Sequence, residues 1–247
     1  MNTSTRPVSD FTTRQWQLSY RTSAGGPDAP AVSILHDFYI PVLRRSVAYD
    51  RVAGYFRSSS LAAASQGFSA FTRTGGVMRM VVGADLAPHD IQAILDGDEQ
   101  RLADELNQAL GTPASWPEDV DRGVTLLAWM VAHGFLEIRV AFRVHGETGK
   151  PLPFTDTTDG YVHEKWAVFT DSLQHHIYIN GSLNESRTAL VHNAENIDVH
   201  GDWHSDRDQA RVQSALADFE RIWQNQNPYL RVLTLPEAVR QNLVTIA

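Results

Sequence analysis

The spacing of apolar residues along the chain predicts which segments are helices and which are strands. Apolar residues three and four positions apart indicate helices, and this spacing is found over 35–43, 61–71, 88–97, 99–110, 120–133 and 206–223. Short runs rich in Val, Ile and Phe indicate strands, at 51–56, 77–82, 135–142, 161–169, 177–180 and 193–199. Because strands alternate with helices, the pattern predicts an α/β fold with helices on both faces of a central sheet.

Glycine, proline and capping residues divide the chain further. Residues 1–30 are polar and contain Gly25-Gly26-Pro27, which predicts an N-terminal arm before a domain over 31–235. Pro41 predicts a kink or a restart in the first helix, and Ser205 is placed to cap the last one. Residues 236–247 suggest a helix or a linker to a further domain.

Composition limits the classes of function. Cysteine is absent, which excludes disulfides, thiolate metal sites and a cysteine nucleophile. We find no signal peptide and no run of 18 apolar residues, so we expect a cytoplasmic protein without a membrane span. The net charge of −8 argues against a surface that is basic all over. A nucleic-acid enzyme with this charge needs its basic groups gathered in a groove, or a partner that holds the nucleic acid.

One stretch of the chain combines residues suited to phosphate chemistry. His163 and Lys165 lie two apart on a predicted strand, so both side chains leave the same face. Lysine occurs otherwise only at Lys150, and arginine does not replace it at a tight phosphate site. The next strand and the segment after it supply a glycine where a phosphate can approach the backbone, two donors, and an acid able to orient a histidine. These residues are Gly181, Ser182, Asn184 and Glu195.

Two further groups have both a functional and an ordinary interpretation. Arg51, Tyr55 and Arg57 share one face of the first strand, where they would line a phosphate groove or form salt bridges. The segment from His200 to His204 contains two histidines and Asp202, but its polar turn composition favours a solvated loop over a metal site. The pair His175-His176 is expected at the surface, and we predict no metal.

The spacing H-x-K, then G-S-x-N, then N-x-E resembles the half-site motif of the phospholipase D superfamily, in its nuclease branch. The preceding YDRVAGYF and GGVMRMVVGADL segments are similar to phospholipase-D-like domains of bacterial helicase-associated and restriction-type nucleases. The resemblance implies a mixed sheet flanked by helices, a phosphohistidine intermediate and no cofactor. It assigns His163 as nucleophile, Lys165 and Asn184 as phosphate ligands, Ser182 as the motif serine and Glu195 as the acid that orients histidine.

The resemblance also implies a function and partners. The function is metal-independent endonuclease cleavage of DNA, in a helicase-linked phage-defence or restriction system. One motif per chain implies a homodimer. Domains of the resembled kind are often fused to, or encoded beside, a helicase, so the resemblance also implies a helicase or ATPase partner. Five residues separate Lys165 from Asp171 where the usual motif has four, so the role of this aspartate is in question. The alternatives are a nucleic-acid-binding or assembly module with a vestigial site, and a phospholipase or phosphatidyltransferase.

Overall fold

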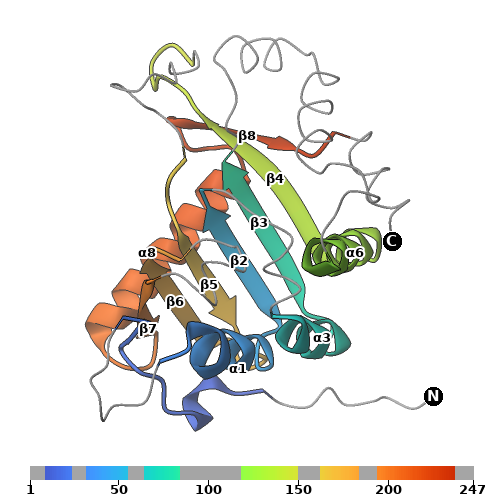
Figure 1. Ribbon diagram of the computed structural model, residues 1–247. Coiled ribbons are helices and arrows are strands. Elements are labelled where there is room, and N and C mark those ends of the chain that lie inside the picture. The colour runs from blue at the N-terminus through green and yellow to red at the C-terminus, as the bar shows by residue number, and fades with distance from the viewer. Residues whose placement is uncertain are drawn as a thin grey trace, which may run out of the picture.

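The computed structural model describes residues 9–23, 32–54, 64–83, 118–149, 162–183 and 194–236. Their centre is a mixed eight-stranded sheet in the order β1-β7-β6-β5-β2-β3-β4-β8 (Figure 1). Strands β2, β3 and β4 are parallel to one another, whereas the other neighbours are antiparallel. The strands are β1 (Ser19–Arg21), β2 (Ala48–Ala53), β3 (Val77–Gly83), β4 (Leu136–Arg143), β5 (Trp166–Thr170), β6 (His176–Gly181), β7 (Asn196–Gly201) and β8 (Leu230–Thr234).

Helices cover both faces of the sheet, as predicted for this α/β fold. One core cluster joins the sheet to η2 (Ile34–Tyr39), α1 (Ile40–Leu43), α3 (Ser65–Arg73) and α6 (Glu118–Ala132). A second cluster joins the opposite face to α8 (Asp206–Trp223), which Figure 1 shows behind the sheet. Among the described residues, no helix is long and apolar enough to cross a membrane.

Local signals at two helix ends acted as expected. The hydroxyl of Ser205 accepts a hydrogen bond from the backbone N–H of Asp208 at 3.1 Å and so caps α8. Pro41 marks a restart: η2 is a π-helix, and α1 begins at Ile40 with the proline in its first turn. A proline is tolerated there because the first N–H groups of a helix have no partner within it. The predicted helices at 88–97 and 99–110 lie outside the described residues.

The expected N-terminal arm over 1–30 is wrong for its described part, residues 9–23. Here β1 pairs with β7, and Phe11, Trp16 and Tyr20 are buried in the core. Edge-to-face contacts join Trp16 to Phe11 and to Phe38 of η2. Isolated aromatic residues in a polar stretch show no helical or strand period, so only their distant partners reveal their burial. Strand β8 was missed for a similar reason, because five residues after a helix carry little pattern.

The predicted strand at 161–169 begins later than expected. Only Trp166–Thr170 pairs with β2 and β6 as β5, and residues 162–165 form an extended segment that leads into it. The antiparallel register sets Trp166 opposite Val52, close to the end of β2. The segment therefore lies at the edge of the sheet where β2, β3, β4 and β6 end and β5, β7 and β8 begin. In open α/β sheets, ligands bind outside the carboxyl ends of parallel strands.

Candidate active site at the sheet edge

His163 and Lys165 lie in the extended segment that passes over the ends of β2 and β3. Glycines make this passage possible. A Cβ on Gly83 would lie 3.0 Å from the carbonyl oxygen of Val162, and one on Gly54 would lie 3.3 Å from the Cα of His163. The side chain of His163 is exposed, while Lys165 is half-buried. An exposed histidine and a half-buried lysine thus lie two residues apart at one end of the sheet.

The ammonium group of Lys165 is held in a confined space. Its Nζ donates a hydrogen bond of 2.7 Å to the backbone carbonyl of His163. A Cβ on Gly54 would lie 3.4 Å from the same Nζ, so the glycine leaves room for it. Burial, and then the charge of Arg51, lower the pKa of Lys165 below its ordinary value, and Glu195 opposes the shift. An arriving phosphate would relieve this unfavourable field.

The end of β6 and the start of β7 bring the next motif residues to this edge. The backbone N–H of Gly181 donates to the carbonyl of Lys165 at 3.3 Å, which joins the two motifs directly. Ser182 Oγ donates to the carboxylate of Glu195 and accepts from the N–H of Asn196 at 3.1 Å. Gly181 has no room for a side chain, because a Cβ would lie 2.1 Å from the carbonyl oxygen of Asn196.

Glu195 is 7% exposed. Its carboxylate accepts a hydrogen bond from Ser182 Oγ, and its negative charge favours the protonated form of Lys165. Its carboxylate therefore lies within the site that the motif spacing predicts. The expected role of Glu195, orienting a histidine, stays a prediction. Asn184, the second predicted phosphate ligand, lies outside the described residues, directly after Leu183.

Arg51 is placed differently from the groove-lining position that the sequence suggested. It is 1% exposed, and its Nη2 donates to the carbonyl of Leu183. The guanidinium thus bonds to the backbone directly after Ser182, and its charge contributes to the lowered pKa of Lys165. The alternation of residues along a strand tells which side chains share a face, but not whether that face is turned to solvent or to the interior. At Arg51 the face is turned to the interior. Tyr55 and Arg57, the other predicted groove residues, lie outside the described residues.

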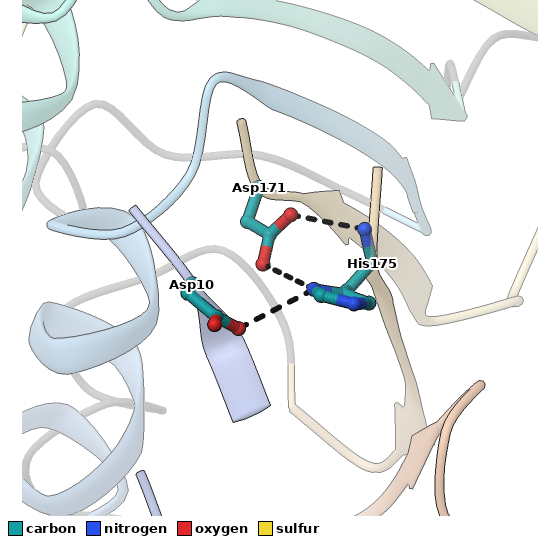
Figure 2. Close-up of side chains that lie close together, drawn as sticks. All are labelled: Asp10, Asp171 and His175. Atoms are coloured by element: carbon teal, nitrogen blue, oxygen red, sulfur yellow. Dashed lines mark hydrogen bonds and ion pairs between the residues drawn. The ribbon is translucent and has the colours of Figure 1, made fainter. Parts of the chain in front are cut away.

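Asp171 directly follows β5, at the opposite end of this strand from His163, and is fully buried. Figure 2 shows it beside His175. Its Oδ1 accepts from the N–H groups of Leu173 and His175, both at 2.9 Å. Its Oδ2 accepts from the N–H of Phe11 at 2.7 Å. Asp171 thus joins the β5–β6 turn to the N-terminal segment. These hydrogen bonds account for an aspartate at this position without a catalytic role.

Figure 2 also shows Asp10 and Asp171 beside His175 Nδ1, at 3.3 and 3.1 Å. Among the described residues, this is the one group of three whose ligand atoms are close enough to share a cation. Both oxygens of Asp171 already accept backbone N–H groups. Hydrogen bonds from Thr12 lower the pKa of Asp10 below its ordinary value. These contacts describe a structural clamp, and His175, expected at the surface, is half-buried in it.

The other histidine-rich segment does not gather its side chains. His200 Nδ1 lies 2.8 Å from Asp208, whereas Asp202 lies 2.8 Å from His176. The segment 202–204 forms a turn before α8, in line with the loop expected there. His200 and His176 thus each pair with a different carboxylate, and the segment does not form a shared metal site.

A pocket of about 540 Å³ opens beside His163, and the sequence reasoning did not find it. Its lining comes from the end of β4, the segment before β5 and the turn before β8, namely Arg143, Val162, His163, Glu164, Asn227, Tyr229 and Leu230. These segments are far apart in the chain. No spacing rule connects them, because only the pairing of β4 with β8 brings them together.

No protein-family model matches the sequence, and no curated protein does. Among solved structures, the chain is similar to NucT from Helicobacter pylori, at 10% identity and a TM-score of 0.43, over 75% of this chain and 84% of that one. It is similar to the phospholipase D family member Nuc from Salmonella typhimurium, at 12% identity and 0.39, with the same coverage. Phosphatidylserine synthase from Haemophilus influenzae shows 14% identity and 0.42, over 92% of this chain and 44% of that one.

Proposed function

We propose that this chain is a phosphodiesterase of the phospholipase D type that acts on DNA through a covalent phosphohistidine. The observation that supports it is the convergence at one sheet edge of His163, Lys165, Ser182 and Glu195, which come from the segments before β5, after β6 and before β7. A nucleophile beside a confined ammonium group is the arrangement that phosphoryl transfer requires.

The proposed reaction proceeds in two displacements. In the first, a ring nitrogen of His163 attacks phosphorus, a P–N bond forms, and the P–O bond to the leaving group breaks. A second histidine donates its proton to the leaving oxygen. In the second displacement, the now neutral histidine takes a proton from water, which attacks phosphorus and releases His163. Lys165, with Asn184, stabilises the negative charge on the phosphoryl oxygens.

The second histidine is supplied by a second copy of the chain, which makes the active enzyme a twofold dimer. A single chain carries one such motif, and isologous dimers are the commonest assembly of identical subunits. Mass measurement by light scattering at micromolar concentration is expected to show a dimer. Wild-type chains are also mixed with an excess of the inactive variant His163→Ala. Activity per wild-type chain should fall, because most wild-type chains then pair with a partner that lacks the second histidine. A fully active monomer would contradict this arrangement.

DNA is the proposed substrate, and a helicase or ATPase the proposed partner that loads it. This partner would answer the problem raised by the net charge of −8, which leaves little general attraction for nucleic acid. Phospholipid cleavage, and a module with a vestigial site, are the competing functions. They are separated by the substrate that the purified chain cleaves.

The proposal predicts cleavage that persists in excess chelator, because a histidine nucleophile needs no metal-activated water. The measurement uses an oligonucleotide, a small diester such as methyl 4-nitrophenyl phosphate, and phosphatidylglycerol vesicles, each with and without EDTA. Trapping with a radiolabelled substrate and acid-free electrophoresis should show an alkali-stable, acid-labile label on His163. Activity that is lost on chelation and restored by a divalent ion would contradict the metal-independent mechanism. Cleavage of lipid alone would contradict DNA as the substrate.

A further inference from the structure

The pocket beside His163 has the size of a ligand site. Its volume of about 540 Å³ falls within the range of roughly 300–1,000 Å³ that small-molecule sites occupy. One wall is His163 itself, so whatever fills the pocket is next to the reacting phosphate. Arg143 at the end of β4 and Tyr229 before β8 form other parts of the wall.

Tyr229 is a fixed aromatic surface. Its backbone N–H donates to Asn227 Oδ1 at 2.9 Å, and its carbonyl accepts from the N–H of Val144 at 3.0 Å. Its ring packs against the backbone of Gly146, where an added Cβ would lie 2.7 Å from Cε1. Even so, the residue is 59% exposed. A large aromatic side chain held in place yet left open to solvent is suited to stacking with a planar ligand.

The charges of the pocket nearly cancel. Arg143 forms no ion pair with another described residue, and Glu164 presents a carboxylate whose Oε2 accepts from Trp166 Nε1 at 2.8 Å. A cation and an anion together do not favour a phosphate, for which Lys165 is already in place. They do not favour an acyl chain either, since burying both beside a hydrocarbon is costly. They suit a neutral, planar group whose edge carries donors and acceptors, as a nucleobase does.

We infer that the pocket holds one unpaired nucleobase next to the scissile phosphate, stacked on Tyr229, with Arg143 and Glu164 bonding its edge. The inference rests on the proposed function and narrows its substrate to single-stranded or locally unpaired nucleic acid. A paired base cannot enter, because its edge is engaged and its faces are stacked within the duplex. Stacking also tolerates different sequences, since every base has a π-face.

The test measures binding and does not depend on turnover. In a His163→Asn background, which keeps the substrate intact, the affinity of a fluorescent single-stranded oligonucleotide is compared with that of an abasic strand of equal length. Tyr229→Ala is expected to weaken binding of the normal strand about tenfold and that of the abasic strand less than about twofold. Tyr229→Phe should retain the affinity. Leu173→Ala, at another exposed apolar residue on the β5–β6 turn, is the matched control and should change neither.

Each outcome decides the inference. A tenfold effect confined to strands with bases, and weaker binding of the same strand in a duplex, support it. Equal weakening for normal and abasic strands, no weakening, or no binding of oligonucleotide overturns it. So does an effect of Tyr229→Ala on phosphatidylglycerol vesicles in place of oligonucleotides. If Tyr229→Ala weakens binding only of strands that carry bases, but the wild-type chain cleaves no diester, the proposed function fails and the assignment of the pocket to a nucleobase stands.

Discussion

Replacing His163 with alanine is expected to abolish phosphodiester cleavage without unfolding the protein. The expected loss is at least about four orders of magnitude in kcat, because in the proposed mechanism His163 is the nucleophile and its removal eliminates the covalent route. Stability should be unchanged, because the side chain is exposed and belongs to neither core cluster. Surface substitutions of this kind usually alter the free energy of unfolding by less than about 0.5 kcal/mol.

The measurement pairs steady-state kinetics with a thermal melt. The matched control is His36→Ala, which removes an exposed histidine on η2, near the other end of the molecule's sheet. It should leave both activity and melting temperature as they are. If His163→Ala lowers the melting temperature by many degrees, the residue is structural. If it keeps measurable turnover and the His36 variant behaves identically, another group is the nucleophile.

Lys165→Arg is expected to lower kcat/KM by on the order of a hundredfold or more, although the charge is kept. The reason is space. Nζ is confined between the carbonyl of His163, at 2.7 Å, and Gly54, whose Cβ would lie 3.4 Å away. The guanidinium is longer and planar, so it displaces either the phosphate or the His163 segment. A shift of about 1 Å in the reacting groups can cost on the order of a hundredfold.

The pH profile adds a readout that a merely structural role would not alter. In the proposed mechanism the ammonium form of Lys165 binds the phosphate, so activity is expected to be lost as the pH rises through the pKa of Lys165. Burial and the neighbouring Arg51 lower that pKa below the ordinary value of a lysine. The pH at which kcat/KM declines on the alkaline side should therefore also lie below the ordinary pKa of a lysine. Residual activity of Lys165→Arg should lack this limb, because arginine stays charged throughout that range.

Arg207→Lys is the control for this exchange, since it swaps the same two residue types at an exposed position of α8. It should leave the rate and the alkaline limb unchanged. Near-wild-type turnover of Lys165→Arg would refute the role of a tight phosphate ligand. An alkaline limb that persists in this variant would assign the titration to another group.

Periodicity and capping predict most of the described helices and strands, though not how the strands pair. The segment 206–223 coincides with α8, and its cap Ser205 acts through a bond to a residue three positions on. The segment 77–82 coincides with β3 to within one residue. These signals are local: amphipathic spacing, a cap and a glycine each act over a few residues, so a single stretch of sequence contains all the information needed.

The positions of the motif residues were predictable in part. The spacing H-x-K and G-S-x-N indicated neighbouring strand ends, and Gly181 does bond to the carbonyl of Lys165. Strand β5 begins later than the predicted strand at 161–169, because the pairing partner β2 ends at Ala53 and its last partner in β5 is Trp166. A strand lasts only as long as its neighbour, and that limit is set by another part of the chain.

The sequence by itself determined the alternation of strands and helices, the capped α8 and the residues of the candidate site. Tertiary structure alone decided which of their neighbours face that site. It buried Arg51 behind Leu183, assigned Asp171 to the clamp with His175, and brought Tyr229 beside His163 through the pairing of β8 with β4. The physical reason is that burial and the meeting of strand ends depend on partners distant in the chain, which local spacing does not specify.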